Sequence, residues 1–151
     1  MSLESVRAFF AKNAPEITVI ESPMSSATVA LAADAYGVEP ARIAKTLSLR
    51  VGDQVILIVA SGTSRMDNKK VKARFGGKPK MLGLEEVAHI TGHEVGGVCP
   101  FGLKTPLPVY CDISLKAFDE VVPAAGSIYS AVRIAPLRMA ELVDAEWVDV
   151  C

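Results

Sequence analysis

The chain mixes two spacings of apolar residues, one helical and one strand-like. Leu3, Val6, Phe9 and Phe10 recur at the spacing of a single helical face, and they predict a first helix that ends near Asn13. Similar stripes predict further helices over 26–36, 64–75, 84–90 and 136–143, with a short turn over 41–44. Alternating or continuous apolar runs predict strands over 17–20, 46–51, 54–60, 107–113, 128–134 and 147–150.

The pair Gly52-Asp53 separates two of these strand runs, 46–51 and 54–60. Glycine and aspartate in a two-residue connection are typical of a tight β-hairpin, so the two strands are expected to be antiparallel. Because the other strands alternate with helices, the sheet as a whole should be mixed rather than purely parallel. The 151 residues therefore predict one domain over 1–151 of the α/β (mixed α+β) class.

Composition excludes several classes of protein. Half of the residues are apolar but only 6% are aromatic, so we expect a core of valine, leucine, isoleucine and alanine. The apolar runs are too short to cross a membrane, and charged side chains interrupt the N-terminal segment where a secretion signal would be apolar. Cys99, Cys111 and Cys151 form neither a paired disulfide framework nor a C-x-x-C site, which predicts a reducing, cytoplasmic location.

Residues 92–103 form the most unusual stretch, Gly-His-Glu-Val-Gly-Gly-Val-Cys-Pro-Phe-Gly-Leu. Glycine loses the most conformational freedom on ordering and proline lacks a backbone donor, so the stretch is a poor helix or strand. An ordered glycine loop lets a ligand approach the backbone, whereas a plain turn between a helix and a strand has the same composition. Both interpretations stay open from the spacing, which excludes only a Walker A loop and a dinucleotide fingerprint.

Lys45 is the second feature of interest. Along its predicted strand it lies in register with Leu47 and Leu49, whereas Thr46 and Ser48 lie on the other face. An unpaired ammonium on an apolar face is costly. The side chain therefore either extends past the end of the strand to water or serves as a cationic anchor in a pocket.

Two segments together resemble the YbaK/ProX superfamily. They are residues 27–47, which end in Ile-Ala-Lys-Thr-Leu, and residues 92–102, with the pattern G-x-x-x-G-G-V-x-P-F-G. Their order and separation fit that family, and the resemblance covers nearly the whole chain. Such proteins are similar to the editing insertion domain of bacterial prolyl-tRNA synthetases and act in trans as aminoacyl-tRNA deacylases. The resemblance implies a mixed, partly closed β-sheet surrounded by helices, in agreement with the strand pattern.

The same resemblance implies a site. In family members the lysine that matches Lys45 is essential and the glycine that matches Gly96 lines the reaction centre, so both are expected to be catalytic. The residues expected to bind the substrate beside them are Thr46, Gly97, Val98, Cys99, Pro100 and Phe101. An aminoacyl ester is labile, so its hydrolysis needs a positioned water and a stabilised oxyanion but no metal or cofactor. The 2′-hydroxyl of the terminal ribose is available for proton transfer, because the sequence offers no Ser/His/Asp set and only two histidines.

The expected partner is the acceptor end of a mischarged tRNA, with a small amino acid on tRNA-Pro or a related tRNA. A cognate aminoacyl-tRNA synthetase is a candidate second partner, and no membrane is involved. Cys99 stands where many relatives have serine or threonine, and residues 126–131 lack the carboxylate or histidine of some relatives. These departures leave the amino acid open among alanine, serine, threonine, cysteine and non-protein analogues.

Basic residues concentrate in one part of a chain whose net charge is −1. Seven of the sixteen lysines and arginines lie within positions 65–80, where the only acidic residue is Asp67. We expect the predicted helix there to contact tRNA phosphates, through Lys69, Lys70, Lys72 and Arg74. A solvated helix face is the alternative explanation of such a run.

Two other functions fit the same residues. A thiol enzyme would use Cys99 as its nucleophile, which requires a lowered thiol pKa, and no base partner is identifiable in the sequence. A non-catalytic module would bind aminoacyl-adenosine or RNA through Lys45 without any turnover.

Overall fold

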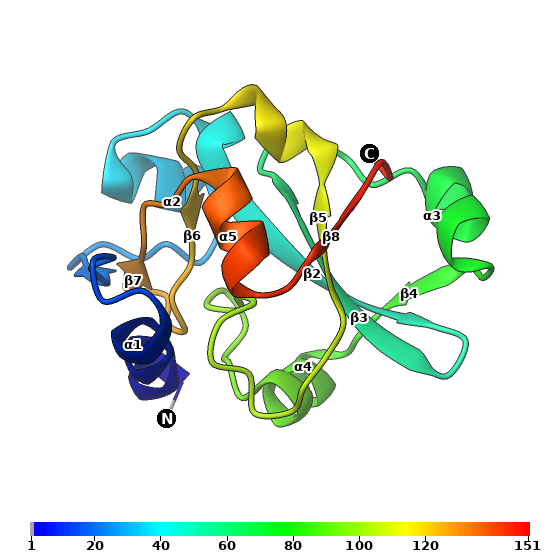
Figure 1. Ribbon diagram of the computed structural model, residues 1–151, viewed down its shortest axis with the longest axis horizontal. Helices are drawn as coiled ribbons and strands as arrows, with labels where there is room; N and C mark the ends of the chain where they lie inside the picture. The colour runs from blue at the N-terminus through cyan, green and yellow to red at the C-terminus, as the bar shows by residue number, and fades with distance from the viewer. Residues whose placement is uncertain (1) are drawn as a thin grey trace.

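A computed structural model describes residues 2–151 as a mixed β-sheet with helices around it (Figure 1). The two long strands β2 (Ile43–Val51) and β3 (Gln54–Ser61) form an antiparallel hairpin across the predicted Gly52-Asp53 turn. The other strands are β1 (Ile20–Glu21), β4 (Pro79–Met81), β5 (Val109–Asp112), β6 (Val122–Pro123), β7 (Ser130–Ala131) and β8 (Glu146–Val148). The main sheet has the order β4-β2-β3-β5-β8, with parallel pairs β3–β5 and β5–β8, so the expected mixed class is confirmed.

Helix boundaries follow local capping chemistry. The α-helices are α1 (Ser2–Asn13), α2 (Val29–Tyr36), α3 (Asn68–Phe75), α4 (Leu84–Thr91) and α5 (Pro136–Leu142), and the 3₁₀ helices are η1 (Pro40–Arg42) and η2 (Ile113–Ala117). Thr28, rather than the predicted Ser26, caps α2 by accepting the backbone N–H of Leu31. Of the two candidate caps at the start of the basic helix, Asp67 and Ser64, Asp67 caps α3 by accepting the backbone N–H groups of Lys69 and Lys70. The longest helix in the described part, α1, has 12 residues, and none is long and apolar enough to cross a bilayer.

Several short strands differ from the prediction. Of the runs expected over 17–20 and 128–134, only Ile20–Glu21 and Ser130–Ala131 pair as strands. The carbonyl of Ile128 instead accepts the backbone N–H of Ser26 at 2.6 Å, which takes this segment out of a regular ladder. Two- and three-residue strands such as β4 and β6 carry too little periodic pattern to be found in the sequence.

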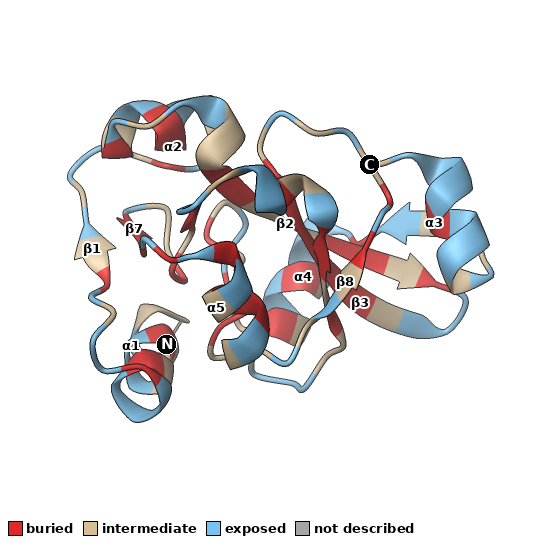
Figure 2. Cartoon of the chain, turned by 45° about the horizontal axis from the view of Figure 1, so that its top comes forward, coloured by how far each residue is buried: buried red, intermediate tan, exposed pale blue. Residues whose placement is uncertain are grey.

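The two faces of the β2–β3 hairpin pack against different helices. On one face Leu49 and Ile58 form a core cluster with Val71 of α3. On the other face Leu57 and Val59 belong to a larger cluster that includes α1 and α5. Figure 2 shows α3 as a largely exposed helix, and Val71 is its one buried residue. We call these two sides the α3 face and the α1 face.

Strand register assigns the neighbouring side chains of β2 to these faces. Residues directly opposite each other in an antiparallel pair share a face. Thr46 is opposite Val59 and Ser48 is opposite Leu57, which places both hydroxyls on the α1 face. Lys45 alternates with them and therefore lies on the α3 face.

The sheet curls onward from the start of β2. β6 pairs with β2 in parallel, through Ile43–Val122 and Ala44–Pro123. A single bridge between Ala124 and Ala131 continues the pairing to β7, which in turn pairs with β1. This curled edge carries α2 over the α1 face and so creates a concave region above β2.

His93 joins helix α1 to the glycine loop. The side chain is fully buried, with Nε2 2.7 Å from the carbonyl oxygen of Phe101 and Nδ1 2.5 Å from Oγ of Ser2. A carbonyl can only accept, so Nε2 of the neutral ring donates to Phe101. The single proton of the Ser2 hydroxyl lies between two acceptors, because Oγ is 2.5 Å from both Nδ1 and the carbonyl oxygen of Gly126. Burial lowers the pKa of His93, against an opposing effect of the Phe101 carbonyl, so the folded protein holds the neutral ring.

We expect acid to destabilise the fold through His93. Because its pKa in the folded state lies below the ordinary value of about 6.5, the unfolded chain binds more protons there. The stabilisation is therefore fully present above that value and is lost as the pH falls below it, by at most about 1.4 kcal/mol of unfolding free energy per pH unit. Thermal melts of the wild type and of His93→Gln, from about pH 7.5 to 5, measure this effect. Glutamine keeps a donor for Phe101 but does not titrate, so its Tm should fall less steeply; parallel curves would refute the assignment.

Candidate functional site

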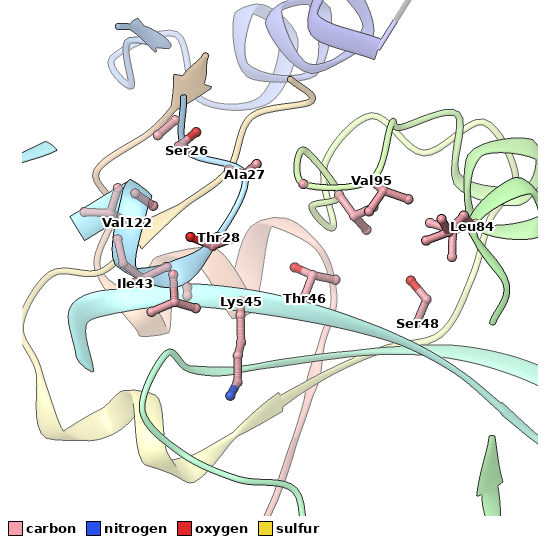
Figure 3. A pocket seen from close by; sticks show the side chains of 18 of the residues that line it. Ser26, Ala27, Thr28, Ile43, Lys45, Thr46, Ser48, Leu84, Val95 and Val122 are labelled. Atoms are coloured by element: carbon pink, nitrogen blue, oxygen red, sulfur yellow. The ribbon is translucent and has the colours of Figure 1, made fainter. Parts of the chain in front are cut away.

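A cavity of about 270 Å³ lies over β2 on the α1 face (Figure 3). β2 forms its floor, α2 and the segment leading into it form one wall, and α4 with the 95–98 loop forms the other. In Figure 3 the side chains of Thr46 and Ser48 rise from the strand towards Val95 and Leu84. The polar side chains among its lining residues are Ser26, Thr28, Tyr36, Lys45, Thr46 and Ser48.

The cavity has a closed end and an open mouth. The lining residues at the closed end are all buried: Ala32, Tyr36, Ile43, Val122 and Ala131. Exposed lining residues lie on both sides of the opening: Ala27 and Thr28 before α2, and the large apolar Met81 at 61%, Leu84 at 70% and Val95 at 49% opposite them. A volume just below the range usual for drug-sized ligands suits a small group, and a larger molecule would leave its bulk at the mouth.

The glycine loop reaches this cavity because two of its residues have no Cβ. Gly96 has a φ of 91°, and a Cβ there would lie 2.9 Å from Cγ2 of Ile128 and 3.2 Å from Cα of Ala27. A Cβ on Gly97 would lie 2.7 Å from the backbone of Ser127. The loop therefore packs backbone against backbone, which requires glycine at both positions.

Hydrogen bonds hold the loop in this place. The N–H of Gly97 donates to the carbonyl of Glu94 at 2.9 Å, and the N–H of Gly126 donates to the carbonyl of Gly97 at 3.1 Å. The Glu94 carboxylate accepts the N–H of Ile128 at 3.2 Å. Within the described residues, the N–H groups of Gly96 and Val98 have no such acceptor, and both residues line the cavity. The wall thus contains two residues whose backbone N–H groups have no acceptor among the described residues.

The structure divides the predicted substrate-binding residues into two groups. Thr46 and Val98 line the cavity, as does the predicted catalytic residue Gly96. The other four belong to the same loop but are buried and do not line the cavity: Gly97, Cys99, Pro100 and Phe101. The Phe101 ring packs 4.7 Å from the ring of Phe10 on α1, so this end of the loop anchors it in the core rather than facing a ligand.

Cys99 has a neighbouring base that the sequence does not reveal. Its Sγ lies 3.6 Å from Nε2 of His93, but both side chains are fully buried and neither lines the cavity. Burial raises the pKa of the Cys99 thiol to about 12, and His93 Nε2 is already bonded to the Phe101 carbonyl. A neutral, inaccessible thiol is a poor nucleophile, which argues against the thiol-enzyme interpretation.

Lys45 lines the cavity with part of its side chain but directs its ammonium away from it. In Figure 3 the Nζ atom extends below β2, on the side opposite Thr46. It donates to the carbonyls of Gly62, at 3.4 Å, and Ser64, in the loop that follows β3. Both partners are neutral, so no carboxylate neutralises this charge within residues 2–151.

The basic helix α3 lies on the α3 face, across the sheet from the cavity. Lys70 already pairs with Asp149 at 3.1 Å and with the carbonyl of Cys151 at 2.8 Å. Arg74 pairs with Glu146. Lys69 and Lys72 are exposed and make no ion pair with other described residues. Two of the four predicted tRNA-binding cations therefore have internal partners.

Sequence reasoning missed three polar residues of the cavity, Ser26, Tyr36 and Ser48. Tyr36 belongs to the apolar stripe of α2, and its periodicity identifies it only as a buried residue. Ser26 and Ser48 carry no sequence signal of their own, because only the fold brings them to one cavity. No three His, Cys, Asp or Glu side chains of the described chain gather as metal ligands.

Comparison with known proteins agrees with this geometry. The family model described as the aminoacyl-tRNA editing domain matches residues 24–142. The Bacillus subtilis protein YwhH is 52% identical over 153 residues, covering 100% of this chain and 98% of YwhH. The Enterococcus faecalis protein named "Putative Cys-tRNA(Pro)/Cys-tRNA(Cys) deacylase EbsC" is 29% identical over 121 residues, covering 78% of this chain and 73% of EbsC.

Structural comparison gives the same result over nearly the whole chain. A crystal structure described as that of "a putative trans-editing enzyme for prolyl tRNA synthetase" has a TM-score of 0.91 and 33% identity, and the match covers 99% of this chain and 96% of the other. The family match includes both the Lys45 segment and the glycine loop, the two segments that meet at the cavity. The chain belongs to the aminoacyl-tRNA editing domain family, within the YbaK/ProX superfamily.

Proposed function

We propose that this protein is a trans-acting aminoacyl-tRNA deacylase, which hydrolyses the ester of a small amino acid mischarged on tRNA-Pro or a related tRNA. The observation that carries the proposal is the cavity wall at Gly96 and Val98, where two unpaired backbone N–H groups stand beside a polar strand floor. The name of EbsC, "Putative Cys-tRNA(Pro)/Cys-tRNA(Cys) deacylase", supports this class of substrate.

Hydrolysis at this site needs few protein groups. With the aminoacyl group in the cavity, a water attacks the carbonyl carbon of the ester, and the N–H groups of Gly96 and Val98 stabilise the negative oxygen that forms. The bond from that carbon to the ribose oxygen then breaks. The water's proton passes to the leaving oxygen, with the neighbouring ribose hydroxyl as relay. Because positioning alone supplies much of the rate, no metal or covalent nucleophile is required.

Lys45 serves in this proposal as the anchor for the terminal nucleotide. Its charge is held only by neutral carbonyls of Gly62 and Ser64, which an anionic phosphate can replace with a stronger, charge-assisted partner. The exchange requires the flexible Lys45 stem to turn its ammonium from the carbonyls below β2 to the cavity side of the strand. The exposed mouth of the cavity is where the nucleotide would lie, because the tRNA is far too large to enter.

The tRNA body would extend from the mouth towards the unpaired charges of α3, Lys69 and Lys72. Lys70 and Arg74 would contribute less, because Asp149 and Glu146 already neutralise them. We place the reaction in the cytoplasm, where tRNA is aminoacylated, with a cognate synthetase as the source of the mischarged tRNA.

The first test is deacylation of a panel of mischarged tRNAs by the wild type and by Gly96→Ala. We expect turnover of at least one small-amino-acid tRNA and a loss of about a hundredfold or more in the variant. The physical reason is that the added methyl group would meet Ile128 and Ala27 and would occupy a backbone with positive φ.

Cys99→Ala is the matched control, because Cys99 lies in the same loop but behind the cavity wall. It should keep turnover within a few fold at a temperature where it remains folded. Equal losses in both variants would favour the thiol enzyme, and binding without turnover of any tRNA would favour a non-catalytic module.

We further expect Lys45→Ala to abolish measurable deacylation of tRNA without unfolding the protein. The variant loses the cation that would hold the terminal phosphate, while the strand around it keeps its ladder bonds to β3. Single-turnover rates and melting curves measure the two effects separately, with Lys12→Ala on α1 as a control for simple loss of charge. A variant that melts normally and turns over like the wild type would remove Lys45 from the site.

The salt dependence of tRNA binding tests the role of α3. Replacing Lys69 and Lys72 together by glutamine removes both charges. The slope of log affinity against log salt should then become shallower by about 0.7 to 0.9 for each phosphate contact that is lost. Hydrolysis of a minimal aminoacyl-adenosine ester should not change, because that substrate lacks the acceptor stem. The matched Lys70→Gln variant should change the slope less, since Lys70 is already paired. An unchanged slope in the double variant would mean that α3 is a solvated face.

A further inference from the structure

Two buried hydroxyl groups in the described chain have no hydrogen-bond partner, and both belong to residues that line the cavity. They are Oη of Tyr36 and Oγ1 of Thr46. A buried hydroxyl without a partner is destabilising, and the great majority of buried polar groups in folded proteins are paired. Two such groups at one cavity therefore indicate that something which enters the cavity completes their hydrogen bonding.

The fold holds Tyr36 firmly in this position. The residue is only 7% exposed and belongs to a core cluster with Ala32, Ile43 and Val122. Its carbonyl accepts from Nη2 of Arg133 at 2.6 Å, which fixes the end of α2. A hydroxyl held so rigidly can select a ligand group by position.

The polar neighbour of this hydroxyl is Ser26, whose own proton is committed elsewhere. The Ser26 hydroxyl donates to the carbonyl of Ile128 at 2.8 Å, and no hydrogen bond joins its oxygen to Oη of Tyr36. Burial raises the pKa of Tyr36, so the phenol is neutral. It can therefore both donate and accept, which matches a hydroxyl group on a ligand.

The exposure of the lining residues indicates which way round a ligand lies in the cavity. Tyr36 lies at the closed end with Ala32, whereas the mouth at Leu84 is exposed. The part of an aminoacyl-tRNA that lies farthest from the nucleic acid is the amino-acid side chain. That side chain must therefore reach the closed end, while the ester stays beside the glycine loop and the Thr46 floor.

Resting on the proposed deacylase function, we propose that Tyr36 is a specificity-determining residue whose hydroxyl hydrogen-bonds a short, hydroxyl-bearing side chain of the aminoacyl group. Thr46 offers its hydroxyl to the part of the aminoacyl group nearer the ester. A site with such a buried donor discriminates against the apolar isostere, because that ligand leaves the donor unpaired. The small walls at Ala32 and Ala131 keep the side chain short.

The test uses stable amide analogues, 3′-aminoacylamino-3′-deoxyadenosines, so that it does not depend on turnover. Binding of the seryl and alanyl analogues, and of the threonyl and valyl analogues, is measured by calorimetry. We expect the wild type to favour the hydroxyl-bearing member of each pair by about tenfold to a hundredfold. Tyr36→Phe removes one oxygen and should bring both ratios close to one, mainly by weakening the seryl and threonyl analogues.

Tyr110→Phe is the matched control, because Tyr110 packs against Phe75 on the α3 face and does not line the cavity. It should leave both ratios unchanged, and melting curves establish that each variant is folded. Equal binding of both members by the wild type, or unchanged ratios in Tyr36→Phe, would overturn this inference and leave the deacylase function standing. Failure of all four analogues to bind the wild type would overturn the proposed function and this inference with it.

Discussion

Backbone lies directly against backbone where the glycine loop meets two other segments of the chain. Gly96 packs on Ala27 and Gly97 packs on Ser127, at separations that leave no room for a Cβ. This contact fixes the distance between α2, which begins just after Ala27, and the wall of the cavity. It also determines where the unpaired N–H groups of Gly96 and Val98 lie. A bulkier loop would separate the walls, so the cavity depends on these two glycines more than on any charged residue.

The β2–β3 hairpin then separates two kinds of chemistry onto its two faces. The α1 face carries the cavity, with the hydroxyl groups of Thr46 and Ser48 pointing into it. The α3 face carries the charge of Lys45 and the basic helix. Because side chains alternate along β2, an uncharged, hydrogen-bonding site and a cationic surface lie on opposite faces of the same strand. This arrangement fits a substrate with a small ester at one end and a polyanion at the other.

The sequence predicts the parts of this architecture that have a local cause. The Gly52-Asp53 hairpin and a helix over 64–75 follow from turn chemistry and apolar periodicity, and the structure contains the hairpin and most of the helix, as α3. Neighbours in sequence need not share a surface, however. Val98 lines the cavity while the adjacent Cys99 is buried behind it, because the loop crosses from the wall into the core between them. Long-range contacts, such as the ion pairs of α3 with residues 146–149, have no local signal at all.

The most direct test of this account is to map which backbone amides respond when an aminoacyl-adenosine amide binds the protein. Heteronuclear NMR titration of the wild type would follow every amide at once. The account predicts the largest shifts at Thr46, Gly96 and Val98, with smaller ones at the start of α2 and little change along α3. Shifts confined to α3, or centred on the buried pair His93 and Cys99, would contradict it, because the ligand would then bind somewhere other than the cavity over β2.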